Sequence, residues 1–195
     1  MDQEGRIGLF EQTTALLSGH FILTSGLHAQ NYVAKRRLYT HPFKVSSLCR
    51  EIAERFKDEG VEAVVSPAVG GVALSQWVAY HLTELTGRFV FAVFAEKVGD
   101  KKEFSFSEGC GDFLVGKRVL VVDDVLTSGG SIDAVRKAVT DAGGIVIGVG
   151  VLWLRGEGKV EMDVPFFALI TKTFPAWKPE DCPLCAKNIP FTKLK

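Results

Sequence analysis

The sequence predicts an α/β protein with a mainly parallel sheet of about five strands flanked by helices. From Val61 onward, short apolar runs alternate with amphipathic segments, a pattern typical of parallel strands joined by right-handed crossovers. The run 119–122 is unbroken, apolar and β-branched, as expected for a strand buried on both faces of such a sheet. The 195 residues fit one domain that can bury a sizeable core.

The elements are expected in a simple order. Apolar positions predict a helix over residues 7–17, then two short strands over 20–24 and 31–35 that form a small appendage outside the main sheet. A helix is expected from Pro42, a favourable first residue, to about Lys57. The main sheet follows, with strands expected at 61–65, 88–95, 119–122, 145–154 and 165–170, and with helices after the first and third of these. A long polar loop over 99–116 and an irregular tail from Phe174 complete the prediction.

The composition argues against several classes of function. The 23 basic and 23 acidic side chains balance, so no net charge attracts nucleic acid or an anionic membrane. Residues 1–6 are polar and lack the apolar core of a secretion signal, and no apolar run reaches transmembrane length. We therefore expect a soluble, cytoplasmic protein.

The stretch 117–133 organises the rest of the chain. Its apolar strand is followed by two carboxylates, Asp123 and Asp124, then by a loop of small and hydroxyl-bearing residues, and then by a helical pattern. A tight turn entering a helix leaves backbone N–H groups unpaired at the positive end of the helix dipole, so this loop suits a phosphate. The carboxylates suit sugar hydroxyls or, through water, a magnesium ion. The loop residues are Thr127, Ser128, Gly129, Gly130 and Ser131.

Residues 121–131, Val-Val-Asp-Asp-Val-Leu-Thr-Ser-Gly-Gly-Ser, resemble the phosphoribosyl pyrophosphate motif of type I phosphoribosyltransferases. Residues 19–35 are similar to the opening segment of orotate phosphoribosyltransferases, and residues 152–158 with 164–169 to the arginine-containing segment of that family. The resemblance extends from about Leu9 to Pro190. It implies one domain over 1–195, with a core at about 41–172 and a small hood over the base formed by about 1–40 and 173–195.

This resemblance implies an orotate phosphoribosyltransferase, a magnesium-dependent glycosyltransferase (pentosyltransferase) of pyrimidine biosynthesis. Such an enzyme transfers ribose 5-phosphate from phosphoribosyl pyrophosphate (PRPP) to N1 of orotate, giving orotidine 5-monophosphate and pyrophosphate. The implied cofactor is Mg²⁺, which bridges the pyrophosphate and ribose hydroxyls of the substrate. The implied partners are PRPP, orotate and a second copy of the chain in a homodimer, with no nucleic acid or membrane.

The resemblance also implies roles for individual residues. Asp123 and Asp124 would hold the ribose hydroxyls, while the 127–131 loop holds the 5-phosphate. Arg155 would face orotate, Thr127 would touch it from the loop, and Lys35 in the hood segment would contact substrate. A guanidinium suits orotate because its forked donors match a carboxylate. The alternative for Arg155 is a surface ion pair with Glu157 or Asp163.

A glycine-bearing turn follows the first strand of the main sheet, in the position of the family's pyrophosphate loop. Paired glycines let backbone N–H groups approach an anion without obstruction by side chains. The sequence alone makes this a modest signal, because a glycine pair before a helix is common. The matching segment is 66–71, and its residues expected to bind substrate are Ala68, Val69, Gly70 and Gly71.

Residues 97–108 correspond in position to the mobile catalytic loop of the family. Lys97, Lys101 and Lys102 would neutralise pyrophosphate while the closed loop excludes water from a cation-like sugar. The histidine that the family commonly carries in this loop is missing here. The alternative is that the lysines form a solvated run of charge.

Two other functions remain open from the sequence. One is the same chemistry on another base, a purine or a modified pyrimidine. The other is a non-catalytic regulator that keeps the fold to sense PRPP, for which the missing loop histidine is the main support.

Cys182 and Cys185 have the spacing of a zinc knuckle but provide only half of the ligands. A structural zinc site would need further ligands from a partner chain, since Cys49 and Cys110 lie far off in the sequence. The four histidines form no ligand pattern in the sequence, and only His28, near the predicted base site, attracts interest. Free thiols or a conditional disulfide are the alternatives.

Overall fold

The computed structural model describes residues 1–23, 25–99, 103–127, 129–155 and 161–193. Its main sheet has the strand order β5-β4-β3-β6-β7-β8, in which the five longer strands run parallel and the two-residue β5 is antiparallel at one edge. The predicted α/β class with a mainly parallel sheet is confirmed. The strands are β3 (Ala63–Pro67), β4 (Phe91–Lys97), β5 (Phe104–Ser105), β6 (Arg118–Leu126), β7 (Ile145–Leu154) and β8 (Phe166–Thr171).

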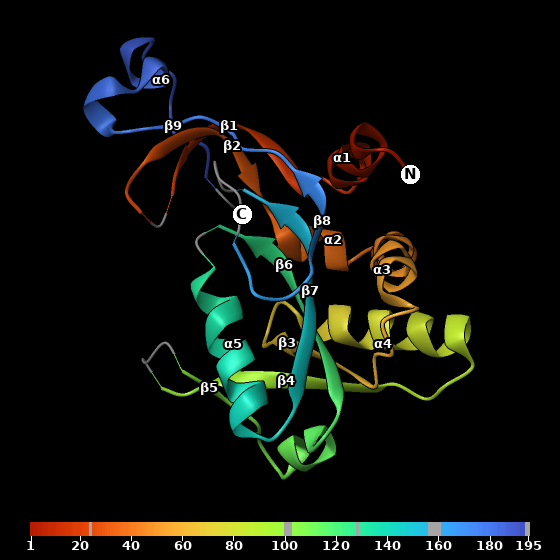
Figure 1. The fold of residues 1–195 in the computed structure, drawn as a ribbon. Coiled ribbons are helices and arrows are strands. Elements are labelled where there is room, and N and C mark those ends of the chain that lie inside the picture. Colours follow the sequence, from red (N-terminus) through yellow and green to blue (C-terminus); the bar gives the residue numbers. More distant parts are fainter. Residues whose placement is uncertain (24, 100–102, 128, 156–160, 194–195) are drawn as a thin grey trace.

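Helices cover both faces of this sheet (Figure 1). On one face lie α1 (Gln3–Gln12), α3 (Pro42–Phe56) and α4 (Val72–Thr86), and on the other lies α5 (Gly130–Asp141). Successive side chains of a strand point to opposite faces, so β6 contributes to both layers of the core. Leu120 and Val122 pack with α3 and α4, whereas Val119 and Val121 pack with α5.

Close packing between α3 and β7 depends on two glycines of the strand. A Cβ atom on Gly148 would lie 2.6 Å from Cε1 of Phe56, and one on Gly150 would lie 2.8 Å from Cγ2 of Ile52. The aromatic ring of Phe56 and the side chain of Ile52 therefore occupy the space that strand side chains would fill. This packing fixes α3 against the centre of the sheet.

A second sheet stands apart from the main one and is formed by both ends of the described chain (Figure 1). Its strands are β1 (Leu16–Ile22), β2 (His28–Val33) and β9 (Ala176–Trp177), and we refer to it as the hood sheet. The helix α2 (Lys35–Tyr39) connects it to α3. The remaining elements are the 3-10 turns η1 (Cys110–Leu114) and η2 (Pro179–Asp181) and the short helix α6 (Pro183–Ala186).

Several boundaries differ from the sequence predictions. The helix expected over 7–17 is α1, which ends earlier because the chain turns at Thr14 (φ 51°) to begin β1. α1 packs on the main core, where the Phe10 and Trp153 rings lie 5.0 Å apart and Nη1 of Arg6 donates to the Leu169 carbonyl at 2.8 Å. The loop expected over 99–116 contains β5 and η1, and the tail expected to be irregular contains β9, η2 and α6.

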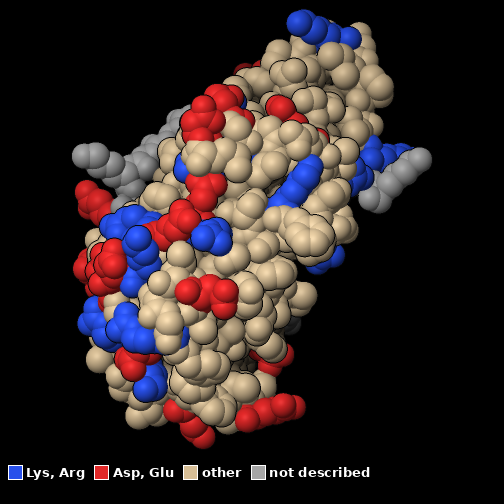
Figure 2. Space-filling view, turned by 90° about the vertical axis from the view of Figure 1, so that its right-hand side faces the viewer, with Lys and Arg blue, Asp and Glu red and all other residues tan. Residues whose placement is uncertain are grey.

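Charges of both signs occur on the face of the molecule shown in Figure 2. On the face that carries α1 and α3, basic and acidic side chains are interspersed among wide uncharged areas (Figure 2). Ion pairs in this region include Arg50 with Glu54 at 3.2 Å and Arg55 with Glu59 at 3.4 Å. Within the described residues, none of the helices combines the length and apolar character that a membrane span requires.

Candidate active site

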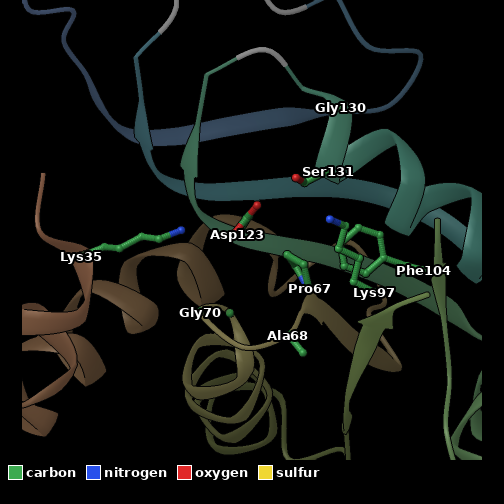
Figure 3. Close-up of a pocket in the computed structure, with 10 residues that line it drawn as sticks. Lys35, Pro67, Ala68, Gly70, Lys97, Phe104, Asp123, Gly130 and Ser131 are labelled. Atoms are coloured by element: carbon green, nitrogen blue, oxygen red, sulfur yellow. The ribbon is translucent and has the colours of Figure 1, made fainter. Parts of the chain in front are cut away.

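A cavity of about 420 Å³ opens near the carboxyl ends of the central strands. β3 and β6 pair only as far as Val65 and Val121, and the chain continues from β3 toward β4 on one side and from β6 toward β7 on the other. Ligands of open α/β sheets bind where the strand order reverses in this way. The cavity is lined by Lys35, Pro67, Ala68, Gly70, Gly71, Lys97, Phe104, Asp123, Gly130 and Ser131 (Figure 3).

Asp123 lies at the centre of this cavity (Figure 3) and is only 7% exposed. Its Oδ1 accepts a hydrogen bond of 2.7 Å from the backbone N–H of Asp124. Burial, and then the charge of Asp124, raise the pKa of Asp123 to about 7, although that N–H opposes the shift. The Asp123 carboxyl group is therefore costly to ionise until hydroxyl donors or a cation enter the cavity.

Asp124 points to the opposite face of β6 and is almost completely buried, at 1% exposure. Nζ of Lys35 lies 2.8 Å from its Oδ1, and the Tyr39 hydroxyl donates to its Oδ2 at 3.1 Å. Burial, followed by the charge of Asp124, raises the pKa of Tyr39 far above its ordinary value. The Tyr39 hydroxyl therefore stays protonated and remains a donor to Asp124 across the working pH range.

Two glycines of the turn between β3 and α4 lie so close to their neighbours that a side chain at either position would have to displace them. A Cβ atom on Gly70 would lie 2.7 Å from Oδ2 of Asp124, and one on Gly71 would lie 2.8 Å from the Pro67 carbonyl oxygen. The bare backbone of both residues consequently borders the cavity at the start of α4. Val69 in the same turn is 84% exposed.

The loop after β6 enters α5 through Gly129, whose φ of 83° favours glycine. Gly130 and Ser131, the first two residues of α5, line the cavity, so the unpaired N–H groups of this helix start border it. Thr127 is exposed. Ser128, which was predicted to belong to the same loop, lies outside the described residues.

Lys97 ends β4 and pairs with Phe104 of β5, and both side chains line the cavity. Figure 3 shows the ammonium groups of Lys35 and Lys97 entering from opposite sides of Asp123. The cavity therefore places two cations around one buried carboxyl group. Lys101 and Lys102, also predicted for the catalytic loop, lie outside the described residues.

Arg155 follows β7, and its backbone N–H donates to the Leu126 carbonyl at 2.8 Å. Burial lowers the pKa of its guanidinium group, and the nearby Tyr32 of the hood sheet opposes that shift. The ion pair considered for Arg155 with Asp163 is not formed, because Asp163 pairs with Arg136. Glu157, the other partner considered, lies outside the described residues.

The structure brings most of the described candidate residues together in one place. Those that line the cavity are Lys35, Ala68, Gly70, Gly71, Lys97, Asp123, Gly130 and Ser131. Those that do not are Val69, Asp124, Thr127, Gly129 and Arg155. Pro67, which belongs to the segment matched to the pyrophosphate loop, also lines the cavity. Sequence reasoning missed Phe104 and Tyr39. Only Tyr39 carried a usable signal, since it lies four positions after Lys35, a spacing that places both on one side of a helix.

Comparisons with known proteins agree with this geometry. Residues 37–182 match the model of the phosphoribosyl transferase domain. The orotate phosphoribosyltransferase of Desulforamulus reducens is 40% identical over 195 residues, 99% of this chain and 96% of that protein. The orotate phosphoribosyltransferase of Thermotoga maritima is 40% identical over 187 residues, which cover 95% of this chain and 94% of that protein. The solved structure of the Mycobacterium tuberculosis enzyme in complex with PRPP aligns with a TM-score of 0.62 at 26% identity, covering 85% of this chain and 95% of that one. The chain therefore belongs to the phosphoribosyltransferase family, and within it to the orotate phosphoribosyltransferases.

Proposed function

We propose that this protein transfers ribose 5-phosphate from PRPP to N1 of orotate, releasing orotidine 5-monophosphate and pyrophosphate. The observation that carries the proposal is the position of Asp123 in a cavity bordered by the starts of α4 and α5 and by two lysines. Two helix starts suit the two phosphate ends of PRPP, and a buried carboxyl group between them suits the sugar. The family relationship to orotate phosphoribosyltransferases supports the same substrates.

The three parts of PRPP have matching parts in the cavity. The 127–131 loop and the start of α5 would bind the 5-phosphate, and the 68–71 turn would bind the pyrophosphate between Lys35 and Lys97. Asp123 would accept hydrogen bonds from the ribose hydroxyls. Asp124 already accepts hydrogen bonds from Lys35 and Tyr39, so we propose that it joins the ribose contact when Lys35 turns to the pyrophosphate.

Magnesium fits this donor set because Asp123 presents a buried carboxylate beside the place proposed for substrate oxygens, and Mg²⁺ prefers carboxylate and phosphate oxygen ligands. When bound, Mg²⁺ would add positive charge to the pyrophosphate leaving group. Asp123 would orient the ribose hydroxyls that share the ion. Lys35 and Lys97 would neutralise the remaining phosphate charge.

The charge of orotate lies on its carboxylate, so N1 must lose its proton as it bonds to C1′ of the ribose. The C1′–O bond to pyrophosphate breaks in the same step, and the released pyrophosphate can accept that proton, so no protein base is required. The work of the protein is to position the two substrates and to stabilise charge as the bond to pyrophosphate lengthens. Lys97 lines the cavity, which supports this role for its ammonium group. We propose that Lys101 and Lys102 supply further positive charge while their loop covers the substrates.

The base site is proposed where β7 ends below the hood sheet. Arg155 would offer its forked donors to orotate, with Thr127 approaching from the phosphate loop. Tyr32 is near enough to Arg155 to influence its pKa, so the hood sheet contributes to this region. An Arg155→Ala variant should lose orotate affinity at least tenfold with PRPP affinity unchanged, as measured by calorimetry with each substrate. An unchanged orotate affinity would refute the assigned base site.

The direct test of the reaction is orotate-dependent release of pyrophosphate from PRPP in the presence of Mg²⁺. A panel with uracil, hypoxanthine and adenine identifies the base, and the proposal requires orotate to turn over fastest. Tight PRPP binding without pyrophosphate release under any base would instead favour a regulator. Repeating the orotate assay with a chelator, and then with Mg²⁺ restored, tests the cofactor.

We also propose that the chain acts as a homodimer. Support comes from the family resemblance and from exposed aromatic side chains, since Phe89 is 73% and Phe113 is 52% exposed. Both rings pack beside Phe91, with centroids 4.9 and 5.4 Å from it, so they form one apolar area. Sedimentation equilibrium should give twice the mass of the chain, and a Phe113→Ser variant should weaken association. A wild-type protein that sediments as a monomer contradicts the proposal.

A further inference from the structure

Among the described residues, one cluster of metal-binding side chains lies outside the candidate active site. It consists of His20, His28, Cys182 and Cys185, whose potential ligand atoms all lie within 4.8 Å of one another. His20 is in β1, His28 begins β2, and the two cysteines flank the start of α6. In Figure 1, α6 and β9 lie beyond the β1–β2 hairpin, on the side away from β3 and α4.

Four of the six separations between the ligand atoms of this cluster match the edges of a tetrahedron. Zinc bonds of about 2.0–2.1 Å to nitrogen and about 2.3 Å to sulfur give ligand–ligand separations of roughly 3.3–3.8 Å. Nε2 of His20 lies 3.3 Å from Nδ1 of His28, 3.5 Å from Sγ of Cys182 and 3.8 Å from Sγ of Cys185. Nδ1 of His28 lies 3.3 Å from Sγ of Cys185. All four of these separations fall within that range.

The surroundings of the cluster orient its ligands. Nδ1 of His20 lies 2.7 Å from the Ile189 carbonyl oxygen, which fixes the proton on Nδ1 and leaves the lone pair of Nε2 facing the thiols. The Phe191 ring packs against both imidazoles, with centroids 4.2 Å from His20 and 5.1 Å from His28. Three of the four ligands are buried, with His20 1%, Cys182 2% and His28 6% exposed, and Cys185 is half-buried at the edge of the site.

This arrangement corrects the sequence analysis, in which the histidines showed no ligand pattern and Cys182 and Cys185 were half of a site. The two missing ligands are His20 and His28, which strand pairing brings close to the cysteines. His28 pairs with Ile22 of β1 on one side and with Trp177 of β9, shortly before Cys182, on the other. Contacts between strands are not visible as spacing in a sequence. No ligand from a partner chain is required.

We propose that His20, His28, Cys182 and Cys185 bind one zinc ion in a closed Cys₂His₂ site. Two thiolates and two imidazoles in tetrahedral positions suit Zn²⁺ better than hard cations such as Mg²⁺. The protein fills all four positions, which is the mark of a structural site rather than a catalytic one. The ion joins the β1–β2 hairpin to the segment that follows β9 and thereby braces the hood sheet, whose third strand has only two residues.

Metal analysis of the full chain tests this proposal. The protein is purified without chelators and without a histidine tag, and its zinc content is measured by mass spectrometry. We expect about one zinc per chain in the wild type and in Cys110→Ser, a matched control whose thiol lies in η1. Cys185→Ser and His28→Gln should each lose most of the zinc. Chelation should lower the melting temperature of the wild type and of Cys110→Ser but leave that of Cys185→Ser unchanged.

A second measurement does not depend on any variant folding. Cobalt added to the zinc-depleted wild type should give the intense visible absorption of tetrahedral Co²⁺ together with a thiolate-to-cobalt charge-transfer band. Zinc added in equal amount should abolish both signals. The proposal is overturned if the wild type holds no zinc and gives no such cobalt spectrum. It is equally overturned if Cys182 and Cys185 form a disulfide in protein purified without oxygen.

Discussion

Lys35 and Asp124 are 89 positions apart in the sequence, yet Nζ of Lys35 lies 2.8 Å from Oδ1 of Asp124. The contact joins the first residue of α2 to the end of β6. The side chain of Lys35 is 45% exposed and that of Asp124 only 1%, so the buried partner depends on the accessible one. The same lysine also lines the candidate active site, so one side chain serves both the buried Asp124 and the cavity.

Replacing Lys35 by Met should destabilise the protein by about 2 kcal/mol, because it leaves the buried Asp124 charge without its cation. The cost is below that of a fully buried pair, since water reaches Lys35. Urea unfolding measures the change. Lys137→Met, which breaks the surface pair with Asp141, is the matched control and should cost less than about 0.5 kcal/mol. Equal losses in the two variants would show that the Lys35 pair is an ordinary surface contact.

Replacing Tyr39 by Phe should cost about 1 kcal/mol, since Oδ2 of Asp124 loses a donor that is protonated at every accessible pH. Because Tyr39 and Lys35 serve the same carboxylate, the two substitutions should not be additive. A double-mutant cycle should give a coupling of at least about 0.5 kcal/mol. Additive losses would contradict a shared role at Asp124.

Replacing Asp123 by Asn should stabilise the substrate-free protein near pH 8 while lowering kcat/KM at least 100-fold. The folded chain raises the pKa of Asp123 from 3.8 to about 7, so protonation favours folding. The stability from this group is full below pH 3.8 and is lost as the pH rises through about 7. Asparagine does not ionise, so the Asn variant does not lose this stability. Above pH 7 its free energy of unfolding should exceed that of the wild type by on the order of 2 kcal/mol.

Asp124→Asn should change the free energy of unfolding in the opposite direction, and it serves as the comparison for Asp123→Asn. It removes the charge that Lys35 and Tyr39 contact, so it should destabilise the chain at neutral pH. Denaturant unfolding between pH 4 and 9 follows both variants. If Asp123→Asn lost stability as Asp124→Asn does, the two carboxylates would have equivalent surroundings, contrary to the structure.

Replacing Gly70 by Ala should lower kcat/KM by roughly 100-fold, because the new methyl group would press on Oδ2 of Asp124 and alter the turn that borders the cavity. Gly8→Ala in α1 is the control, since a Cβ atom there meets nothing within 4 Å. That control should be stabilised by about 0.5–1 kcal/mol with unchanged kinetics. Wild-type activity in Gly70→Ala would remove the argument that the turn requires glycine.

The sequence predicted the main sheet well because its strands are buried on both faces and show as continuous apolar runs. The strand expected over 145–154 is β7 (Ile145–Leu154) without change. The hood was harder, because strands such as β9 have two residues and are held by pairing with β2 rather than by their own pattern. The predicted helix over 7–17 failed at its end for a similar reason, since residues from Leu16 belong to a strand ladder.

The candidate site was predictable where one segment carries the chemistry, as at Asp123 and Gly130. It was not predictable where separate segments meet. Nothing in the sequence indicates that Asp124 faces Lys35 and Tyr39 while Asp123 faces the cavity, since this depends on which face of β6 meets α2. The cluster of His20 with Cys182 has the same origin.

The pairing of β2 with β9 and the contact of Arg6 with the Leu169 carbonyl set an order for assembly during synthesis. Residues 1–33 emerge early from a ribosome but find these partners only after residues 166–177 have been added. The β3–α4 turn and the β6–α5 loop, in contrast, each join a strand to the helix that directly follows it in the sequence. The hood sheet is therefore the last part of the fold that can be completed, and the region proposed for the base is completed with it.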